Sequence, residues 1–197
     1  MTLYCATTNP GKLREFQSAA EDIQIIALRT DAPVPEETGA TFEENAALKS
    51  AYYSKLTEGL LFADDSGLEV DALQGAPGVH SARYAGPHAT DAGNNQLLLR
   101  NLKGIANRTA RFACVIALAS RGTVIATFRG TVEGEMLTEP QGQGGFGYDP
   151  LFFYPPQGRS FGEVALGDKM LLSHRAKALN GLFQFLRANP NLAEQSQ

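Results

Sequence analysis

Short runs of alternating apolar and polar residues predict strands, and longer segments with helical spacing separate them. Strands are expected at residues 2–6, 60–64, 68–72, 111–119, 123–129, near 130–136, and at 151–154. Helices are expected at residues 12–21, 41–56, 91–102 and 173–188. Strands and helices are mixed, with an antiparallel section in the middle. This order predicts an α/β or α+β protein around a mixed sheet.

Local residues mark where these elements begin and end. Thr41 followed by Glu44 fits a capping box at the start of the best-defined helix. Thr90 or Asp91 is expected to cap the helix that follows, and Ser173 to cap the last one. The segment Ser120-Arg121-Gly122 predicts a hairpin between two strands. These signals agree with the hydrophobic pattern.

The block Asp64-Asp65-Ser66-Gly67 allows two interpretations. It follows the apolar run 60–63 and precedes a second alternating run, so it fits the turn of a hairpin. Paired carboxylates at a strand end also suit Mg²⁺, which takes a few carboxylate oxygens and keeps places for water and phosphate. The block alone favours neither interpretation.

The segment Thr7-Thr8-Asn9-Pro10-Gly11-Lys12 joins the first strand to the first helix. Hydroxyls, backbone N–H groups and a lysine at a helix start can bind a phosphate chain. The segment is not a Walker A loop, because Ala6 and Leu13 stand where glycine and Ser or Thr are needed. An ordinary helix start is the alternative.

Two further features depend on what surrounds them. Glu36-Glu37 precedes the helix at 41–56 and is either a metal ligand or a solvated acidic loop. Lys49 shares a helix face with Phe42 and Tyr53. Such a lysine usually extends to water, unless its face meets a polyanion.

The segment at 141–150 is rich in glycine and aromatic residues. Its glycines let the backbone approach a ligand closely, Phe146 and Tyr148 can stack on a flat ring, and Asp149 can accept a hydrogen bond from the ring edge. A mobile loop with its aromatic rings packed in the core is the alternative. Near the last helix, Lys169, His174 and Arg175 are candidate donors to ring carbonyls or phosphates.

Composition excludes several classes of function. The chain has 197 residues and a net charge of −4, which argues against a general nucleic-acid-binding surface. The longest apolar run, at 112–119, is too short to span a bilayer, and the N-terminus lacks a signal-peptide layout. Cys5 and Cys114 are expected to be buried, reduced thiols. We expect one cytoplasmic domain at residues 1–197 that binds neither membrane nor nucleic acid.

Taken together, these blocks resemble the inosine triphosphate pyrophosphatase family, and its bacterial branch in particular. The matching segments run in order along nearly the whole chain: Thr7–Lys12, Glu37-Thr38-Gly39, Thr41-Phe42, Glu44-Asn45-Ala46, Ala63–Leu68, Gly75–Gly78, Ser81–Tyr84, Gly144–Pro150 and Ser173-His174-Arg175. Each block is weak alone, but their order and spacing together are specific.

The resemblance implies a long mixed central sheet flanked by helices in two lobes, with a nucleotide cleft between them. It implies a homodimer that cleaves ITP, dITP and XTP between the α and β phosphates with Mg²⁺, giving the monophosphate and pyrophosphate. A related enzyme that prefers modified pyrimidines and a catalytically silent nucleotide-binding protein are the alternatives. The intact acidic pair and both lysines argue against the silent protein.

The resemblance also implies roles for individual residues. Asp65 matches the catalytic carboxylate and a metal ligand, and Glu37 matches the second acidic metal-site residue, with Glu36 as its alternative. Phosphate and sugar contacts match Thr7, Thr8, Asn9, Pro10, Gly11, Lys12, Lys49 and Ser66. The base-recognition side matches Phe146, Gly147, Tyr148, Asp149, Lys169, His174 and Arg175.

Overall fold

The computed structural model describes residues 1–20 and 23–194. Glu21, the last residue of the first predicted helix, lies outside the described residues. The end of the polar tail, residues 195–197, also lies outside them.

A seven-stranded mixed sheet organises the chain, in the order β2-β1-β3-β4-β5-β6-β7. Its strands are β1 (Thr2–Cys5), β2 (Gln24–Ala27), β3 (Leu61–Val70), β4 (Thr109–Ser120), β5 (Thr123–Met136), β6 (Phe152–Tyr154) and β7 (Arg159–Ser160). Strand β1 pairs in parallel with both β2 and β3, whereas β6 pairs in antiparallel fashion with β5 and β7. The predicted α/β class with a mixed sheet is therefore confirmed.

The α-helices among the described residues are α1 (Pro10–Ala19), α2 (Phe42–Tyr53), α3 (Asp91–Asn101), α4 (Leu166–Leu172), α5 (His174–Ala188) and α6 (Pro190–Glu194). The expected caps are confirmed, because the hydroxyls of Thr41, Thr90 and Ser173 each accept a backbone N–H from the first turn that follows. The short elements β2, β7, α4 and α6 were not predicted, since each offers too few residues for a periodic pattern.

The turn interpretation of Asp64-Asp65-Ser66-Gly67 is wrong. The whole block lies inside β3, so the two strands expected at 60–64 and 68–72 are one. The glycine at position 67 indicated a turn in the sequence, but in the structure Gly67 allows close packing inside a strand. A Cβ at Gly67 would overlap the Ser81 hydroxyl oxygen and lie 2.5 Å from the carbonyl oxygen of Gly78.

The predicted hairpin is confirmed. Arg121 and Gly122 both adopt positive φ, at 50° and 85°, between β4 and β5. This pair of left-handed residues matches the twist of a two-residue hairpin turn. The strand expected near 130–136 continues β5 without a break.

The chain forms two compact units. The first unit contains Met1–Asp65, Cys114–Gly130 and Ser173–Gln197, and the second contains Ser66–Ala113 and Thr131–Leu172. The unit boundaries therefore fall within β3, β4 and β5, and between α4 and α5.

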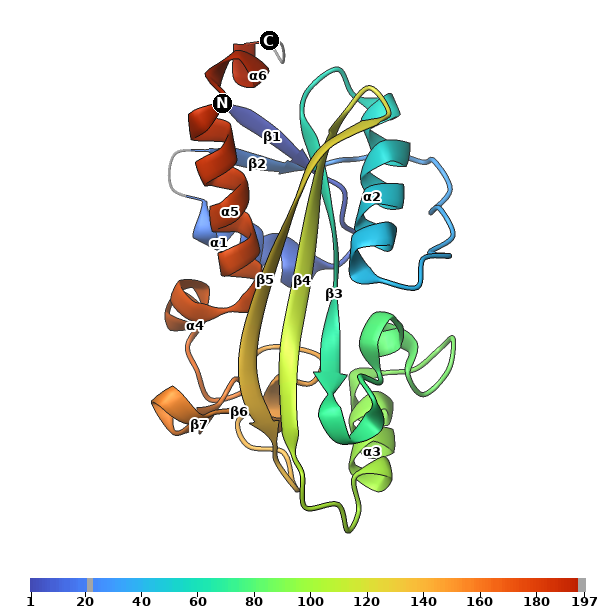
Figure 1. The fold of residues 1–197 in the computed structure, drawn as a ribbon, viewed down its shortest axis with the longest axis vertical. Helices are drawn as coiled ribbons and strands as arrows, with labels where there is room; N and C mark the ends of the chain where they lie inside the picture. Colours follow the sequence, from blue (N-terminus) through green and yellow to red (C-terminus); the bar gives the residue numbers. More distant parts are fainter. Residues whose placement is uncertain (21–22, 195–197) are drawn as a thin grey trace. The chain divides into compact units, whose positions relative to one another are not determined.

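Helices cover both faces of the strands in the first unit. Helices α1 and α5 lie on one side and α2 on the other (Figure 1). Alternate residues of β3 follow this division: Phe62 packs in the core with α1 and α5, whereas Leu61 and Ala63 pack with Tyr53 of α2. Both faces of β3 are buried at this end of the strand, so residues 60–63 read as a continuous apolar run.

The second unit has its own core. Leu98 of α3 and Leu102, which caps the end of that helix, pack in it with residues of β3, β4 and β5. Three aromatic rings meet there, because Phe152 lies 4.5 Å from Phe112 and 5.0 Å from Phe161 between ring centroids. These contacts fix the region from which the glycine-aromatic loop at 141–150 extends.

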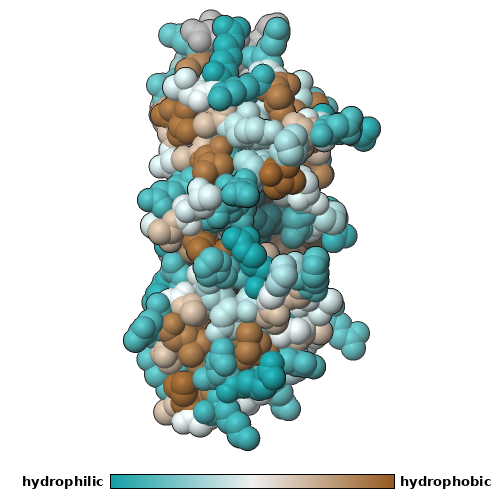
Figure 2. Space-filling view, turned by 90° about the vertical axis from the view of Figure 1, so that its right-hand side faces the viewer, coloured by the Kyte–Doolittle hydropathy of each residue, from teal (hydrophilic) through white to brown (hydrophobic). Residues whose placement is uncertain are grey.

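Over residues 1–20 and 23–194, no helix is both long enough and apolar enough to cross a membrane. On the face that Figure 2 presents, hydrophobic residues are scattered among hydrophilic ones.

Candidate functional site

The acidic pair lies in β3, just beyond the point where its parallel neighbour β1 ends. Strand β1 ends at Cys5, which pairs with Phe62 of β3. Asp64 and Asp65 therefore come just after this paired section, and the loop from Thr7 to Lys12 leaves β1 beside them. The carboxyl ends of parallel strands are the usual ligand-binding edge of α/β sheets.

Asp64 forms a buried ion pair with Lys12. The Lys12 Nζ atom lies 2.8 Å from the Asp64 carboxylate, whose side chain is 1% exposed. Burial alone would raise the pKa of Asp64, but the charges of Lys12, Lys49 and Arg175 outweigh it and lower that pKa. Asp64 is therefore held ionised as the partner of Lys12.

Asp65 has different partners and a different titration. Its carboxylate accepts hydrogen bonds from Lys49 Nζ at 3.2 Å and from Asn45 Nδ2 at 3.1 Å. Burial raises the pKa of Asp65 despite the opposing charges of Lys49 and Lys12, and the nearby Glu37 charge adds to the increase. Of the two neighbouring carboxylates, Asp65 is thus the one with the greater affinity for a proton.

Lys49 lies between two carboxylates. Its Nζ atom is 2.7 Å from Glu37 and 3.2 Å from Asp65, and the residue is buried. The lysine therefore does not extend to bulk water. Burial would lower the pKa of Lys49, but Asp64, Asp65 and Glu37 outweigh it and raise that pKa. Lys49 stays charged inside the cluster.

Asn45 holds the loop that carries Glu37. Its Oδ1 accepts from the backbone N–H of Gly39 at 2.8 Å, while its Nδ2 donates to Asp65. A Cβ at Gly39 would lie 2.7 Å from Asn45 Oδ1, so this close approach needs glycine. Sequence reasoning gave Asn45 no site role, although its spacing of four residues from Lys49 places both on one helix face. Glu36 is exposed, and Glu37 is the acidic residue that reaches the cluster.

The loop before α1 is organised by Asn9. The Asn9 side chain accepts from the backbone N–H groups of Gly11 and Lys12, at 2.8 Å and 3.1 Å, as an N-cap. The Thr7 hydroxyl in turn accepts from the Asn9 N–H. The N–H groups that the sequence offered to a phosphate therefore already have a partner. Thr8 and Pro10 are exposed in the same loop.

His174 and Arg175 belong to the first unit, at the start of α5. Arg175 donates to Glu15 of α1 at 2.8 Å, and both side chains are buried. Sequence reasoning missed Glu15, and the only available sign was an acidic residue beside Phe16 on the buried side of α1. His174 is also buried. Both residues thus share a unit with the acidic cluster, although the resemblance assigns them to base recognition.

Other residues assigned to base recognition lie in the second unit. Lys169 donates to the Asp149 carboxylate at 2.6 Å, and both side chains are at most 3% exposed. The same carboxylate accepts from the Phe146 N–H at 2.9 Å. The Lys169 ammonium also lies 5.3 Å from the centre of the Phe146 ring, within cation–π range. Asp149 therefore organises this loop from inside.

The two aromatic residues of the loop are not equivalent. Tyr148 is buried, and its hydroxyl donates to the carbonyl of Ser81 at 2.8 Å. Burial raises the pKa of Tyr148 well above its usual range. Tyr148 thus fits the core-packing alternative. Phe146 and Gly147 are only half-buried, as is Ser66, which begins the second unit within β3.

The donor set of the first unit fits Mg²⁺. No group of three or more His, Cys, Asp or Glu side chains gathers as a metal site in the described part of the chain. Glu37 and Asp65, however, converge on the same cation, the Lys49 ammonium. Mg²⁺ typically takes one or two protein carboxylates and completes its coordination with water and substrate phosphates. Two converging carboxylates are therefore a sufficient protein contribution.

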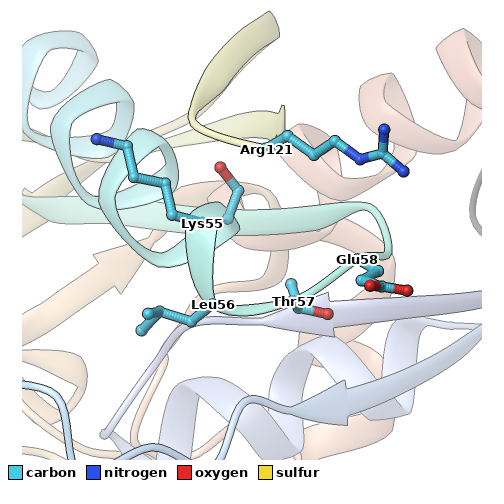
Figure 3. A pocket seen from close by; sticks show the side chains of 6 residues that line it. Lys55, Leu56, Thr57, Glu58 and Arg121 are labelled. Atoms are coloured by element: carbon cyan, nitrogen blue, oxygen red, sulfur yellow. The ribbon is translucent and has the colours of Figure 1, made fainter.

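Two pockets lie away from these residues. One of about 500 Å³ in the first unit is lined by Ser54, Lys55, Leu56, Thr57, Glu58 and Arg121. Its two cationic side chains, Lys55 and Arg121, point away from each other (Figure 3), so they do not form a joint anion site. A smaller one, of about 240 Å³, is lined by Gln157, Arg159, Val164 and Asp168 in the second unit. Neither contains a residue that the sequence assigned to the site.

Comparison with known proteins places this arrangement in context. Residues 3–185 match the Ham1 family. A dITP/XTP pyrophosphatase from Exiguobacterium sp. is 48% identical over 186 residues, covering 92% of this chain and 95% of that protein. The structure of the Staphylococcus aureus Ham1 protein matches with a TM-score of 0.85 and 41% identity, over 95% of this chain and 99% of that one. A nucleoside-triphosphatase / dITP/XTP pyrophosphatase from Mycobacterium abscessus matches with a TM-score of 0.72 and 39% identity, over 92% and 98% of the two chains.

Proposed function

Because the chain belongs to the Ham1 family, we propose that it hydrolyses non-canonical purine nucleoside triphosphates. The products are the nucleoside monophosphate and pyrophosphate, and ITP, dITP and XTP are the substrates. Relatives that are 46–49% identical over about nine-tenths of the chain carry the name dITP/XTP pyrophosphatase. We propose that the enzyme acts in the cytoplasm, where this reaction removes such nucleotides from the cellular pool.

The observation that carries this proposal is the cluster of ion pairs in the first unit. Among its contacts, three cations (Lys12, Lys49 and Arg175) meet four carboxylates (Glu15, Glu37, Asp64 and Asp65). The cluster alone is therefore not cationic, whereas a triphosphate is strongly anionic. Substrate binding needs an added cation, and Glu37 and Asp65 would hold Mg²⁺ for this purpose. When bound, Mg²⁺ supplies charge neutralisation for the phosphates.

The residues of the chain perform the remaining steps. Asp65 accepts the proton of the attacking water, and Lys49 and Asn45 hold its carboxylate in place at 3.2 Å and 3.1 Å. Lys12 and Lys49 bind phosphate oxygens and stabilise the charge that develops in the transition state. Asp64 holds Lys12 in position through the 2.8 Å ion pair.

We assign the base of the substrate to Phe146 and Lys169 of the second unit, and the roles of His174 and Arg175 in base recognition stay a prediction that the family resemblance supplies. A half-buried Phe146 ring offers a surface for base stacking. Protonated donors favour a 6-oxo group over the 6-amino group of adenine, because two donors repel each other. ITP and XTP therefore bind better than ATP.

A panel of triphosphates tests the proposed function. The protein is incubated with Mg²⁺ and ITP, dITP, XTP, ATP or GTP, and the products are separated by chromatography. We expect monophosphate and pyrophosphate from the first three substrates, with ATP and GTP nearly unchanged. Release of orthophosphate, or equal rates with ATP, would contradict the proposal.

The same proposal includes a homodimer. Light scattering coupled to size-exclusion chromatography measures the mass of the assembly directly. A mass twice that of the 21.1 kDa chain is expected, and a monomer at micromolar concentration would contradict this part of the proposal.

A further inference from the structure

Helix α3 contacts the glycine-aromatic loop of the second unit through two side chains. The Asp91 carboxylate accepts the backbone N–H of Gly147 at 2.7 Å. Asn95, one helical turn later, donates its Nδ2 to the carbonyl oxygen of Gly147 at 3.0 Å. Residues four apart on a helix lie on one face, so the two side chains bind one residue from the same side.

Gly147 connects the two aromatic residues of the loop. It adopts a left-handed φ of 61°, and Gly142 and Gly145 earlier in the loop also have positive φ. Glycine-rich segments lose much conformational entropy when they are ordered. A loop of this composition holds the Phe146 ring in one place only if other groups fix the backbone. The contacts to Asp91 and Asn95 provide this fixation from outside the loop.

The remaining contacts of the loop do not replace those of α3. Asp149 binds the Phe146 N–H from within the loop, and Tyr148 is anchored to Ser81. The Asp149 N–H also donates to the Phe146 carbonyl at 3.3 Å, which closes a turn around Gly147 and Tyr148. None of these bonds uses the N–H or the carbonyl of Gly147 itself, and helix α3 supplies the partners of those two groups.

Asn95 is poorly explained by stability alone. Its Oδ1 atom is buried, and no hydrogen bond satisfies it within the described residues. An unsatisfied buried acceptor carries a free-energy cost that an apolar side chain at this half-buried position would avoid. The bond to Gly147 is therefore the better explanation for an asparagine here.

We propose that Asp91 and Asn95 are positioning residues that fix the Gly147 backbone and so orient Phe146 toward the base of the substrate. This inference rests on the proposed function. It concerns base recognition only, because the residues assigned to the phosphates and to water activation lie in the first unit. Loss of either contact should weaken substrate binding and base discrimination while leaving the bond-breaking step nearly unchanged.

The test compares N95D with Q96A. The first replaces a donor by an acceptor of the same shape, facing the Gly147 carbonyl, and the second alters an exposed neighbour on the same helix. We expect N95D to raise KM for ITP about tenfold and to lower the ITP/ATP preference similarly, with kcat within about twofold of wild type. Q96A should match wild type in KM for ITP, in the ITP/ATP preference and in kcat. Because N95D introduces a charge, N95A is measured as well and should show a smaller change in the same direction.

Asp91 is tested by rescue. D91A removes the acceptor for the Gly147 N–H, whereas D91N keeps an acceptor oxygen but removes the charge. D91A should raise KM for ITP and speed amide hydrogen exchange at residues 146–148. D91N should bring both the KM and the exchange rate most of the way back to the wild-type values. Melting temperatures close to that of Q96A would exclude global destabilisation as the cause.

The outcomes separate this inference from the proposed function. An active wild type whose N95D and N95A variants keep the KM and base preference of Q96A would overturn the positioning role alone. Equal effects of D91A and D91N would also overturn it. A wild type that fails to cleave ITP, dITP and XTP would overturn the proposed function, and this inference with it.

Discussion

At the scale of single residues, the structure separates two adjacent carboxylates that the sequence presents as a pair. Asp64 and Asp65 are neighbours in β3 and therefore point to opposite faces of the strand. One binds Lys12, and its pKa is lowered; the other binds Lys49 and Asn45, and its pKa is raised. The sequence could indicate that a carboxylate matters here, but only the packing around each one decides its titration.

We therefore predict that D65N loses turnover and keeps nucleotide binding. Asparagine preserves the shape of the side chain and an acceptor for Lys49, but it cannot take a proton from water. Turnover should fall by about 10²–10⁴-fold, the usual contribution of a general base. Steady-state kinetics with ITP and calorimetric titration of the nucleotide measure the two effects. Activity close to wild type would remove Asp65 from the central role.

The two cysteines allow a second prediction at this scale. Cys5 and Cys114 are buried and free, as the sequence predicted. Burial, with a contribution from the Asp64 charge, raises the pKa of both thiols, so little thiolate exists at neutral pH. We expect no alkylation of the native protein by iodoacetamide within an hour, and modification of both thiols in denaturant. Mass spectrometry of the intact chain distinguishes these states, and rapid labelling of the native protein would contradict the expectation.

At the scale of elements, the sequence predicted the long helices and the hairpin well and predicted β3 poorly. Helices α2, α3 and α5 combine helical spacing with a capping side chain, so two independent local features agree. In β3, an Asp-Asp-Ser-Gly block favours a turn on local grounds, and the tertiary environment overrides it. Gly67 is required by the approach of Ser81 and Gly78, which lie more than ten residues away in the sequence. No local pattern contains that information.

The contact at Gly67 predicts the effect of G67A. A methyl group there overlaps the Ser81 hydroxyl and a backbone carbonyl, so the strand or its neighbour must move. Overpacking of this kind typically costs about 1–3 kcal/mol of unfolding free energy. The matched control is G167A in α4, where an added Cβ meets nothing within 4 Å. Alanine there should be neutral or stabilise by up to about 1 kcal/mol, because glycine disfavours helix. Urea denaturation measures both, and equal stabilities would contradict the packing role of Gly67.

At the scale of the whole molecule, the candidate site draws on segments that the chain places far apart. The first unit alone combines the acidic pair of β3 with residues of α1, α2 and α5, so its cluster is assembled from two of the three separate stretches of sequence that make up this unit. The order of the motifs along the chain predicted that these residues act together. It did not indicate that Glu15 binds Arg175, or that Asn9 already occupies the N–H groups at the start of α1. Such pairings depend on side-chain geometry, which motif spacing does not encode.

The charge of the whole molecule gives the last prediction. The chain carries a net charge of −4, and the cluster of ion pairs described above contains four carboxylates and three cations. A triphosphate therefore meets like charge unless a divalent cation accompanies it. In the presence of EDTA, we expect ITP hydrolysis by wild type to stop. Addition of Mg²⁺ in excess of the chelator should restore hydrolysis by wild type.

The E37Q variant should need more Mg²⁺ for half-maximal rate, because it lacks one of the two converging carboxylates, whereas E36Q, at an exposed position, should match wild type. Identical Mg²⁺ dependence for E37Q and E36Q would show that Glu37 does not take part in binding the cation.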